Sequence, residues 1–168
     1  MSYDVIGGAD GPTSIFIAGK LHTGWLNEFG LIIVIILLIP NIIYALKYKN
    51  VKNLCDNKLI NIIEQIGRYA SMFLMIFNIG IAEFGFLSTK SHFMYIVLNV
   101  ILLVTYWIMW ITYFVKQQSW NSMALAIIPT LLFLINGLTQ MHILLIISAI
   151  VFGIGHIYVT YENIKKTA

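Results

Sequence analysis

Long uncharged apolar runs, separated by short polar stretches, dominate this chain and limit the folds that it can adopt. The first run extends from Phe29 to Leu46 and is interrupted only near its end, by Pro40 and Asn41. A helix that crosses a bilayer needs about 20 mostly apolar residues, which is the length of such a run. Because 60% of all residues are hydrophobic and only 10% are charged, the composition is also too apolar for a soluble domain. We therefore predict an all-α integral membrane protein.

The apolar runs predict one bundle of about five transmembrane helices at 29–168, preceded by a separate N-terminal segment at 1–28. In the stretch 59–67, apolar and polar residues fall on opposite faces of a helix. We expect this stretch to lie at the membrane surface and to lead into the second span. The five expected spans are 29–46, 68–87, 92–115, 120–138 and 141–161.

Basic residues predict the orientation of the bundle, since Lys and Arg collect in short cytoplasmic loops. With five spans, only Lys20 and Lys90 fall on one side of the membrane. We therefore predict a multi-pass protein of the cell membrane with its N-terminus outside and its C-terminus in the cytoplasm. The lysines on the cytoplasmic side are Lys47, Lys49, Lys52, Lys58, Lys116, Lys165 and Lys166.

Charge and motif content argue against several other classes of protein. The net charge of +3 comes from lysines that flank apolar runs, so we expect the lipid bilayer as a partner and no nucleic acid. The sequence contains no plausible nucleophile and base pair, no HExxH motif and no Cys/His cluster at ligand spacing. We predict that the chain is not an enzyme, or at most a non-catalytic membrane subunit, and that it needs no organic cofactor.

A segment rich in glycine and proline, VIGGADGPTSIFIAGKL at 5–21, precedes the first span. Its glycines and proline interrupt regular structure, so we expect a turn, or an unwound half-helix that re-enters the membrane. In an unwound segment, the Asp10 carboxylate, the Thr13 and Ser14 hydroxyls and the carbonyls near Gly11 offer oxygen ligands to sodium. The alternative is an exposed turn with Asp10 and Gly11 at its corner and Thr13 or Ser14 as a helix cap.

Residues 7–16, GGADGPTSIF, resemble the signature of the β subunits of sodium-pumping decarboxylases that act on oxaloacetate, methylmalonyl-CoA or glutaconyl-CoA. In that family the aspartate of the DGPT segment is implicated in sodium binding, and the matching residue here is Asp10. The resemblance implies a sodium-handling component that acts with membrane partner subunits or as a homo-oligomer. It covers about the first twenty residues, and a β subunit is longer with more spans. We therefore do not expect this chain alone to be a complete sodium pump.

Ionisable residues within or beside the expected spans are the other candidate site residues. Glu83 is surrounded by apolar residues near the outer end of the second span, so it forms a second ion site with Asp10 or lies in interfacial water. Glu64 and Arg68 are one helical turn apart and can pair, either as a structural pair at the cytoplasmic interface or as a gate or anion site. The position of His156, without a ligand partner at helical spacing, favours packing over proton transfer.

Three asparagines, Asn78, Asn99 and Asn136, lie within the expected apolar spans. Asparagine in a membrane helix commonly donates a hydrogen bond to a neighbouring helix. We expect all three to hold helices together.

Two functions remain open from the sequence. The first is an ion-handling role related to the decarboxylase β subunits, which predicts that Asp10 is buried by other helices. The second is a membrane interaction protein without transport activity, which predicts that Asp10 is exposed and freely replaceable.

Overall fold

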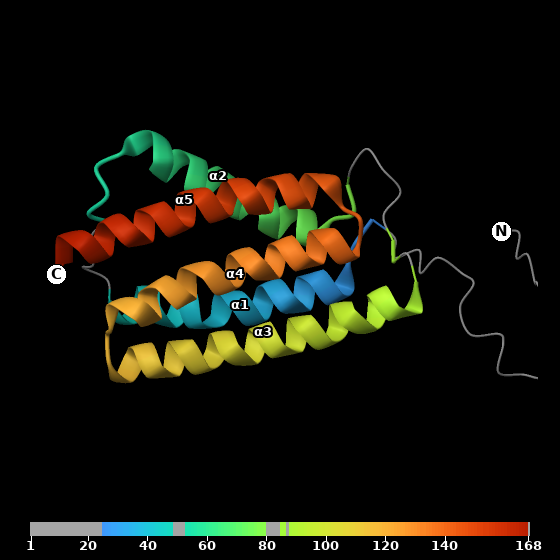
Figure 1. Ribbon diagram of the computed structural model, residues 1–168, viewed down its shortest axis with the longest axis horizontal. Coiled ribbons are helices and arrows are strands. Elements are labelled where there is room, and N and C mark those ends of the chain that lie inside the picture. Colours follow the sequence, from blue (N-terminus) through green and yellow to red (C-terminus); the bar gives the residue numbers. More distant parts are fainter. Residues whose placement is uncertain (1–24, 49–52, 80–84, 87, 168) are drawn as a thin grey trace, which may run out of the picture.

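The structure is a computed structural model that describes residues 25–48, 53–79, 85–86 and 88–167. Within these ranges the chain forms five α-helices that lie side by side and alternate in direction (Figure 1). An isolated antiparallel bridge joins Leu26 to Phe77. The helices are α1 (Glu28–Lys47), α2 (Lys58–Ile76), α3 (Thr89–Val115), α4 (Ser119–Thr139) and α5 (Ile143–Thr167).

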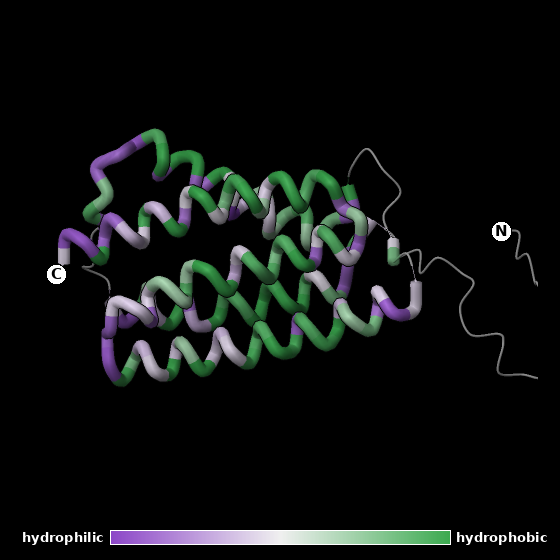
Figure 2. The backbone as a smooth tube through the Cα atoms, viewed as in Figure 1, coloured by the Kyte–Doolittle hydropathy of each residue, from purple (hydrophilic) through white to green (hydrophobic). Residues whose placement is uncertain are grey.

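Four of these helices, α1, α3, α4 and α5, are long and apolar enough to cross a membrane. Hydrophobic residues occupy the middle of the helices, and hydrophilic residues gather toward their ends (Figure 2). Many large apolar side chains on the outside remain exposed, including Ile32, Ile101 and Ile154. Exposed apolar surface on this scale fits contact with lipid rather than with water. The prediction of an all-helical bundle with several potential membrane spans is therefore confirmed.

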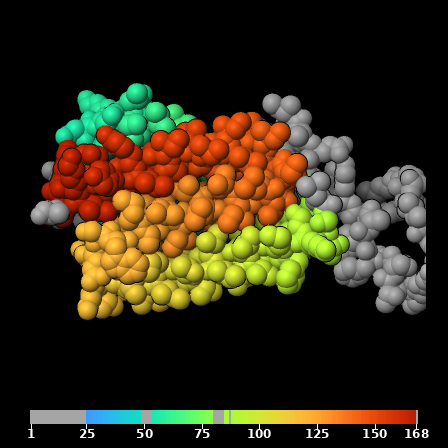
Figure 3. All heavy atoms as spheres, viewed as in Figure 1, coloured from blue at the N-terminus to red at the C-terminus, as the bar shows by residue number. Residues whose placement is uncertain are grey.

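Helix α5 lies between α2 and α4, and α3 packs on the far side of α4 (Figure 3). Helix α1 contacts both α2 and α3. The shared core is built from large side chains such as Met75 of α2, Tyr106 of α3, Leu132 of α4 and Leu145 of α5. The five helices thus enclose one continuous core.

The second helix differs from the span expected at 68–87. Helix α2 begins ten residues earlier, at Lys58, and ends at Ile76. Its end is set by a tertiary contact, because Asn27 donates its backbone N–H to the Ile76 carbonyl at 2.7 Å and Phe77 is extended. The stretch 59–67 is therefore the first half of one continuous helix.

The polar face of α2 is only partly enclosed in the bundle, because Glu64 is buried and Gln65 is exposed, and the neighbouring apolar residues point outward. Glu64 is only 5% exposed, whereas Leu59, Ile62 and Ile66 are 66%, 56% and 61% exposed. A helix at the membrane surface would turn its polar face to water. In α2, Glu64 is enclosed and Gln65 is exposed. The position of 59–67 at the membrane surface stays a prediction.

The alternating helix directions bring most loop lysines to one end of the bundle, which we call the basic end. Among the described residues, Lys90 lies at the opposite end, in the first turn of α3. This distribution is the one that five alternating spans predict, and the placement of the basic end in the cytoplasm stays a prediction. The described lysines of the basic end are Lys47, Lys58, Lys116, Lys165 and Lys166.

Two of the three expected asparagine contacts between helices are present. Asn136 Nδ2 donates to Asn99 Oδ1 at 2.7 Å, and Asn99 Nδ2 donates back to Asn136 Oδ1 at 3.3 Å. Both side chains are buried between α3 and α4. Asn78 follows the end of α2, and its backbone N–H donates to the Trp25 carbonyl at 2.9 Å. The structure therefore places Asn78 after helix α2 rather than within it.

We expect Asn136→Val to lower the free energy of unfolding by about 1–2 kcal/mol, because it leaves the buried Asn99 amide without its side-chain partner. The double variant Asn99→Val/Asn136→Val is expected to lose less than the sum of the two single variants. Unfolding in mixed detergent micelles measures all three changes. Strictly additive losses would contradict a direct bond between the two amides.

Candidate functional site

Three ionisable side chains meet between α2 and α5. Arg68 forms an ion pair with the Glu64 carboxylate one helical turn earlier on α2. From α5, His156 places its Nδ1 at 3.0 Å from the same Glu64 oxygen, Oε1. Glu64 therefore has a partner on each of the two helices, and we call these three residues the charged cluster.

Two glycines let the helices approach closely enough for the charged cluster to form. A Cβ atom on Gly155 would lie 2.8 Å from the Glu64 Cα, and one on Gly67 would lie 2.6 Å from the Phe152 backbone nitrogen. Backbone atoms of a packed helix cannot move aside as the end of a side chain can. The absence of side chains at both positions is therefore what brings Glu64 of α2 next to His156 of α5.

An aromatic ring and a hydroxyl pair extend the polar contact between α2 and α5. The Phe152 ring stacks on the His156 imidazole with 4.8 Å between centroids, and the Arg68 guanidinium lies 5.9 Å from the same ring. Two helical turns after Glu64, Ser71 Oγ donates to Ser148 Oγ at 3.1 Å. The polar stripe of α2 thus faces α5 over most of its length.

Access to the charged cluster is uneven. The side chain of Glu64 is 6% exposed, that of His156 is 21% exposed and that of Arg68 is 42% exposed. Glu64 lies six residues into α2, which places it about 9 Å along the helix from the basic end. The carboxylate is therefore enclosed, and the cluster opens to the surroundings through Arg68 and His156.

His156 contacts both members of the ion pair through one ring nitrogen. Its Nδ1 lies 3.0 Å from Glu64 Oε1 and 3.4 Å from the Arg68 guanidinium nitrogen Nη2. The charges of the Glu64 carboxylate and the Arg68 guanidinium cancel, so the cluster is an enclosed ion pair with an imidazole beside it.

A second group of buried polar side chains lies at the end of the bundle opposite the basic end. Asn27 accepts from the Gly30 N–H as the cap of α1 and donates through Nδ2 to Gln140 Oε1 at 3.2 Å. Tyr95 and His142 are buried at the same end. The sequence does not predict this group, because its members lie at or near the ends of four helices and share no motif.

The structure places only part of the expected site. Glu64 and Arg68 pair as their spacing allows, with Glu64 more deeply enclosed than an interfacial position implies. His156 was expected to be a packing residue, and its contact with Glu64, 92 positions away, was not foreseen. Gly155, next to His156, was the one sequence signal for this contact, because glycine in a membrane helix allows a neighbouring helix to approach closely. The other candidates, Asp10, Gly11, Thr13, Ser14 and Glu83, lie outside the described residues, so the sodium site and the second ion site stay predictions.

Among the residues that the structure describes, no group of three or more His, Cys, Asp or Glu side chains is placed to hold a metal ion. The resemblance to the decarboxylase β subunits rests on residues 7–16, which lie outside the described ranges. Comparisons of the chain with models of protein families, with curated proteins and with solved structures give no match.

Proposed function

We propose that this chain is a small ion-handling component of a membrane, which acts with partner subunits or as a homo-oligomer. The observation that carries the proposal is Glu64, an enclosed carboxylate on a helix whose outer face is mostly apolar. Ionisable groups are rare at membrane depth because they are costly there, and those that occur commonly mark ion or proton pathways. Within the described residues, the charged cluster joins α2 to α5 through the contacts of Glu64 with Arg68 and His156.

The proposal includes α2 as a fifth membrane span. Its 19 residues make a helix of about 28 Å, close to the hydrocarbon thickness of about 30 Å. Most of its outward side chains are apolar, such as Leu59, Ile62 and Ile66. Glu64 meets His156 of α5 inside the bundle, whereas Gln65 and part of Arg68 are exposed. With α2 as a span, every described loop lysine of the basic end falls on one side of the membrane, as the positive-inside rule requires.

Sodium is the cation that the N-terminal motif favours. The similarity of GGADGPTSIF to the decarboxylase β subunits puts Asp10 in the position of a sodium ligand, with Gly11, Thr13 and Ser14 as neighbouring oxygen donors. In this proposal the charged cluster is a separate group, which takes part in proton exchange. Sodium binding and proton exchange are therefore tested by different measurements.

We expect sodium chloride to raise the thermal midpoint of the detergent-purified protein above its value in choline chloride, because a ligand that binds only the folded state stabilises it. Sodium at 100 times its dissociation constant stabilises by about 2.7 kcal/mol, a rise of roughly 5–10 °C for a chain of this size. Asp10→Asn is expected to remove the rise, whereas Glu28→Gln, a matched loss of one carboxylate at the start of α1, keeps it.

Identical curves for wild type in the two salts would refute sodium binding and leave the motif as an exposed turn. Proton exchange is measured separately, as acidification of liposomes that contain the protein under an imposed pH gradient. Wild type is expected to exceed empty liposomes, and Glu64→Gln is expected to fall toward them. Flux equal to that of empty liposomes would reject the ion-handling role of the charged cluster.

One observation favours the second function, a membrane interaction protein without transport. Glu64 already has two partners, Arg68 and His156, and Gly155 packs against its backbone. A carboxylate that is paired with a cation and closely packed in this way can hold two helices together without any transport role. In that case Glu64→Gln changes the stability of the protein and leaves liposome flux unaltered.

A further inference from the structure

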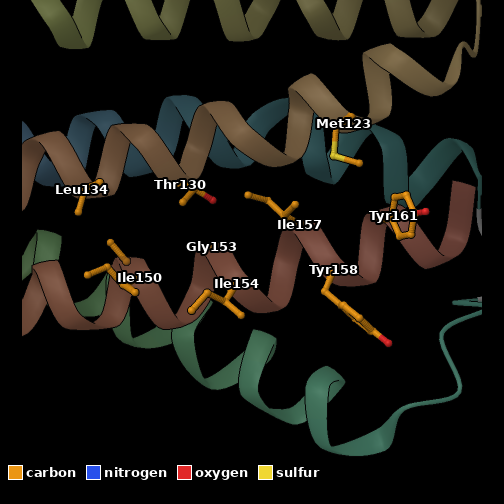
Figure 4. A pocket seen from close by; sticks show the side chains of 10 residues that line it. Met123, Thr130, Leu134, Ile150, Gly153, Ile154, Ile157, Tyr158 and Tyr161 are labelled. Carbon is orange, nitrogen blue, oxygen red and sulfur yellow. The ribbon is translucent and has the colours of Figure 1, made fainter.

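An apolar groove runs along the outer surface between α4 and α5 (Figure 4). Its volume is about 520 Å³, and it is open to the surroundings along its length. The α5 side chains that border it are exposed, with Ile154 at 64%. The residues that shape it include Met123, Thr130 and Leu134 of α4 and Ile154, Tyr158 and Tyr161 of α5.

Gly153 gives the groove its depth. A Cβ atom there would overlap the Thr130 side chain of α4, so the two helices touch at this point without a side chain of α5 between them. Larger residues follow on the outward face of α5 and form the rim. The groove is thus a shallow, open depression in the apolar surface of the bundle.

The length of the groove matches one leaflet of a bilayer. Its α5 wall extends from Ala149 to Tyr161, a rise of about 18 Å along the helix. Half of the hydrocarbon core is about 15 Å thick. The groove ends near the basic end of the bundle, so it covers the leaflet on that side.

The two ends of the groove differ in chemistry. Toward the middle of the bundle its walls are aliphatic, whereas toward the basic end they include the rings of Tyr158 and Tyr161 (Figure 4). Lys165 follows Tyr158 by seven residues and Tyr161 by four, so the three lie on one face of α5. Tyrosine at this depth is typical of the membrane interface, and a lysine there attracts anionic headgroups.

We propose that this groove binds one acyl chain of an anionic phospholipid, whose phosphate lies against Lys165 at the basic end. The aliphatic walls accommodate the chain, the tyrosines lie at headgroup level, and the lysine selects the charge of the headgroup. This binding site is independent of the charged cluster, which lies between α2 and α5.

Native mass spectrometry of the full chain tests the site, with phosphatidylglycerol and phosphatidylcholine of equal acyl chains added to the detergent-purified protein. Wild type is expected to bind one phosphatidylglycerol with about fivefold preference, the effect of one lysine near a headgroup. Lys165→Gln is expected to remove the preference. Lys116→Gln, a matched loss of one lysine from another loop of the basic end, is expected to keep it.

A second variant tests the groove itself. Ile154→Trp fills it and is expected to weaken binding of both lipids, whereas Ile147→Trp, on an equally outward position of α5 away from the groove, leaves binding as in wild type. Equal binding of the two lipids by wild type, or an unchanged preference in Lys165→Gln, would overturn the proposal. A lipid-free dimer that Ile154→Trp disrupts would assign the groove to a second copy of the chain and overturn it as well.

Discussion

Replacing Gly155 with leucine is expected to lower the free energy of unfolding by about 3 kcal/mol or more and to separate Glu64 from His156. The new Cβ atom would lie 2.8 Å from the Glu64 Cα, so α2 and α5 must move apart. Movement of the two helices also removes the hydroxyl contact between Ser71 and Ser148. The midpoint of unfolding in mixed detergent micelles measures the loss.

The neighbouring position offers a matched control for this variant. Ile154 is exposed on the outer surface of α5, so Ile154→Leu changes an adjacent side chain without touching α2. Gly155→Ala adds the same Cβ atom and nothing beyond it, so its expected loss of stability is smaller. This variant provides the measurement if the leucine variant does not fold. Midpoints for both Gly155 variants equal to that of Ile154→Leu would show that α2 and α5 do not pack as described.

The apolar runs predict most helices well, because a long uncharged stretch in a membrane chain has few other structures available. Helix α1, Glu28–Lys47, and helix α4, Ser119–Thr139, extend one residue beyond the expected spans 29–46 and 120–138 at each end. Helix α2 departs most, since its end depends on hydrogen bonds to residues near Leu26, about fifty positions earlier in the chain. Such a tertiary contact leaves no periodic signal in the sequence.

The candidate site was harder to predict than the fold. The spacing of Glu64 and Arg68 is visible in the sequence because the pair is local. The contact with His156 needs the relative position of α2 and α5, which a single sequence does not contain. The amphipathic stretch 59–67 also permits two opposite arrangements, with its polar face toward water or toward other helices, and only the packing on α5 distinguishes them.

Glu64→Leu is expected to destabilise the protein by about 1–3 kcal/mol. Removing one partner of a fully buried ion pair costs about 3–5 kcal/mol, and the partial exposure of Arg68 reduces that figure. The double variant Glu64→Leu/Arg68→Leu is expected to recover most of the loss, because it also removes the Arg68 charge that Glu64→Leu leaves without its partner. The free energies of unfolding of wild type, the two single variants and the double variant form the cycle that measures this coupling.

The same cycle separates the two functions proposed for the charged cluster. If the charged cluster serves only to hold α2 and α5 together, the double variant is expected to stay less stable than wild type. The coupling energy between Glu64 and Arg68 is then of the order of 1 kcal/mol. A double variant more stable than wild type would mean that the charges are kept although apolar side chains pack better there. Retention of a destabilising group is typical of functional sites, so that result, together with reduced proton flux in Glu64→Gln, favours the ion-handling role. Additive losses would show that the pair contributes nothing through its charges.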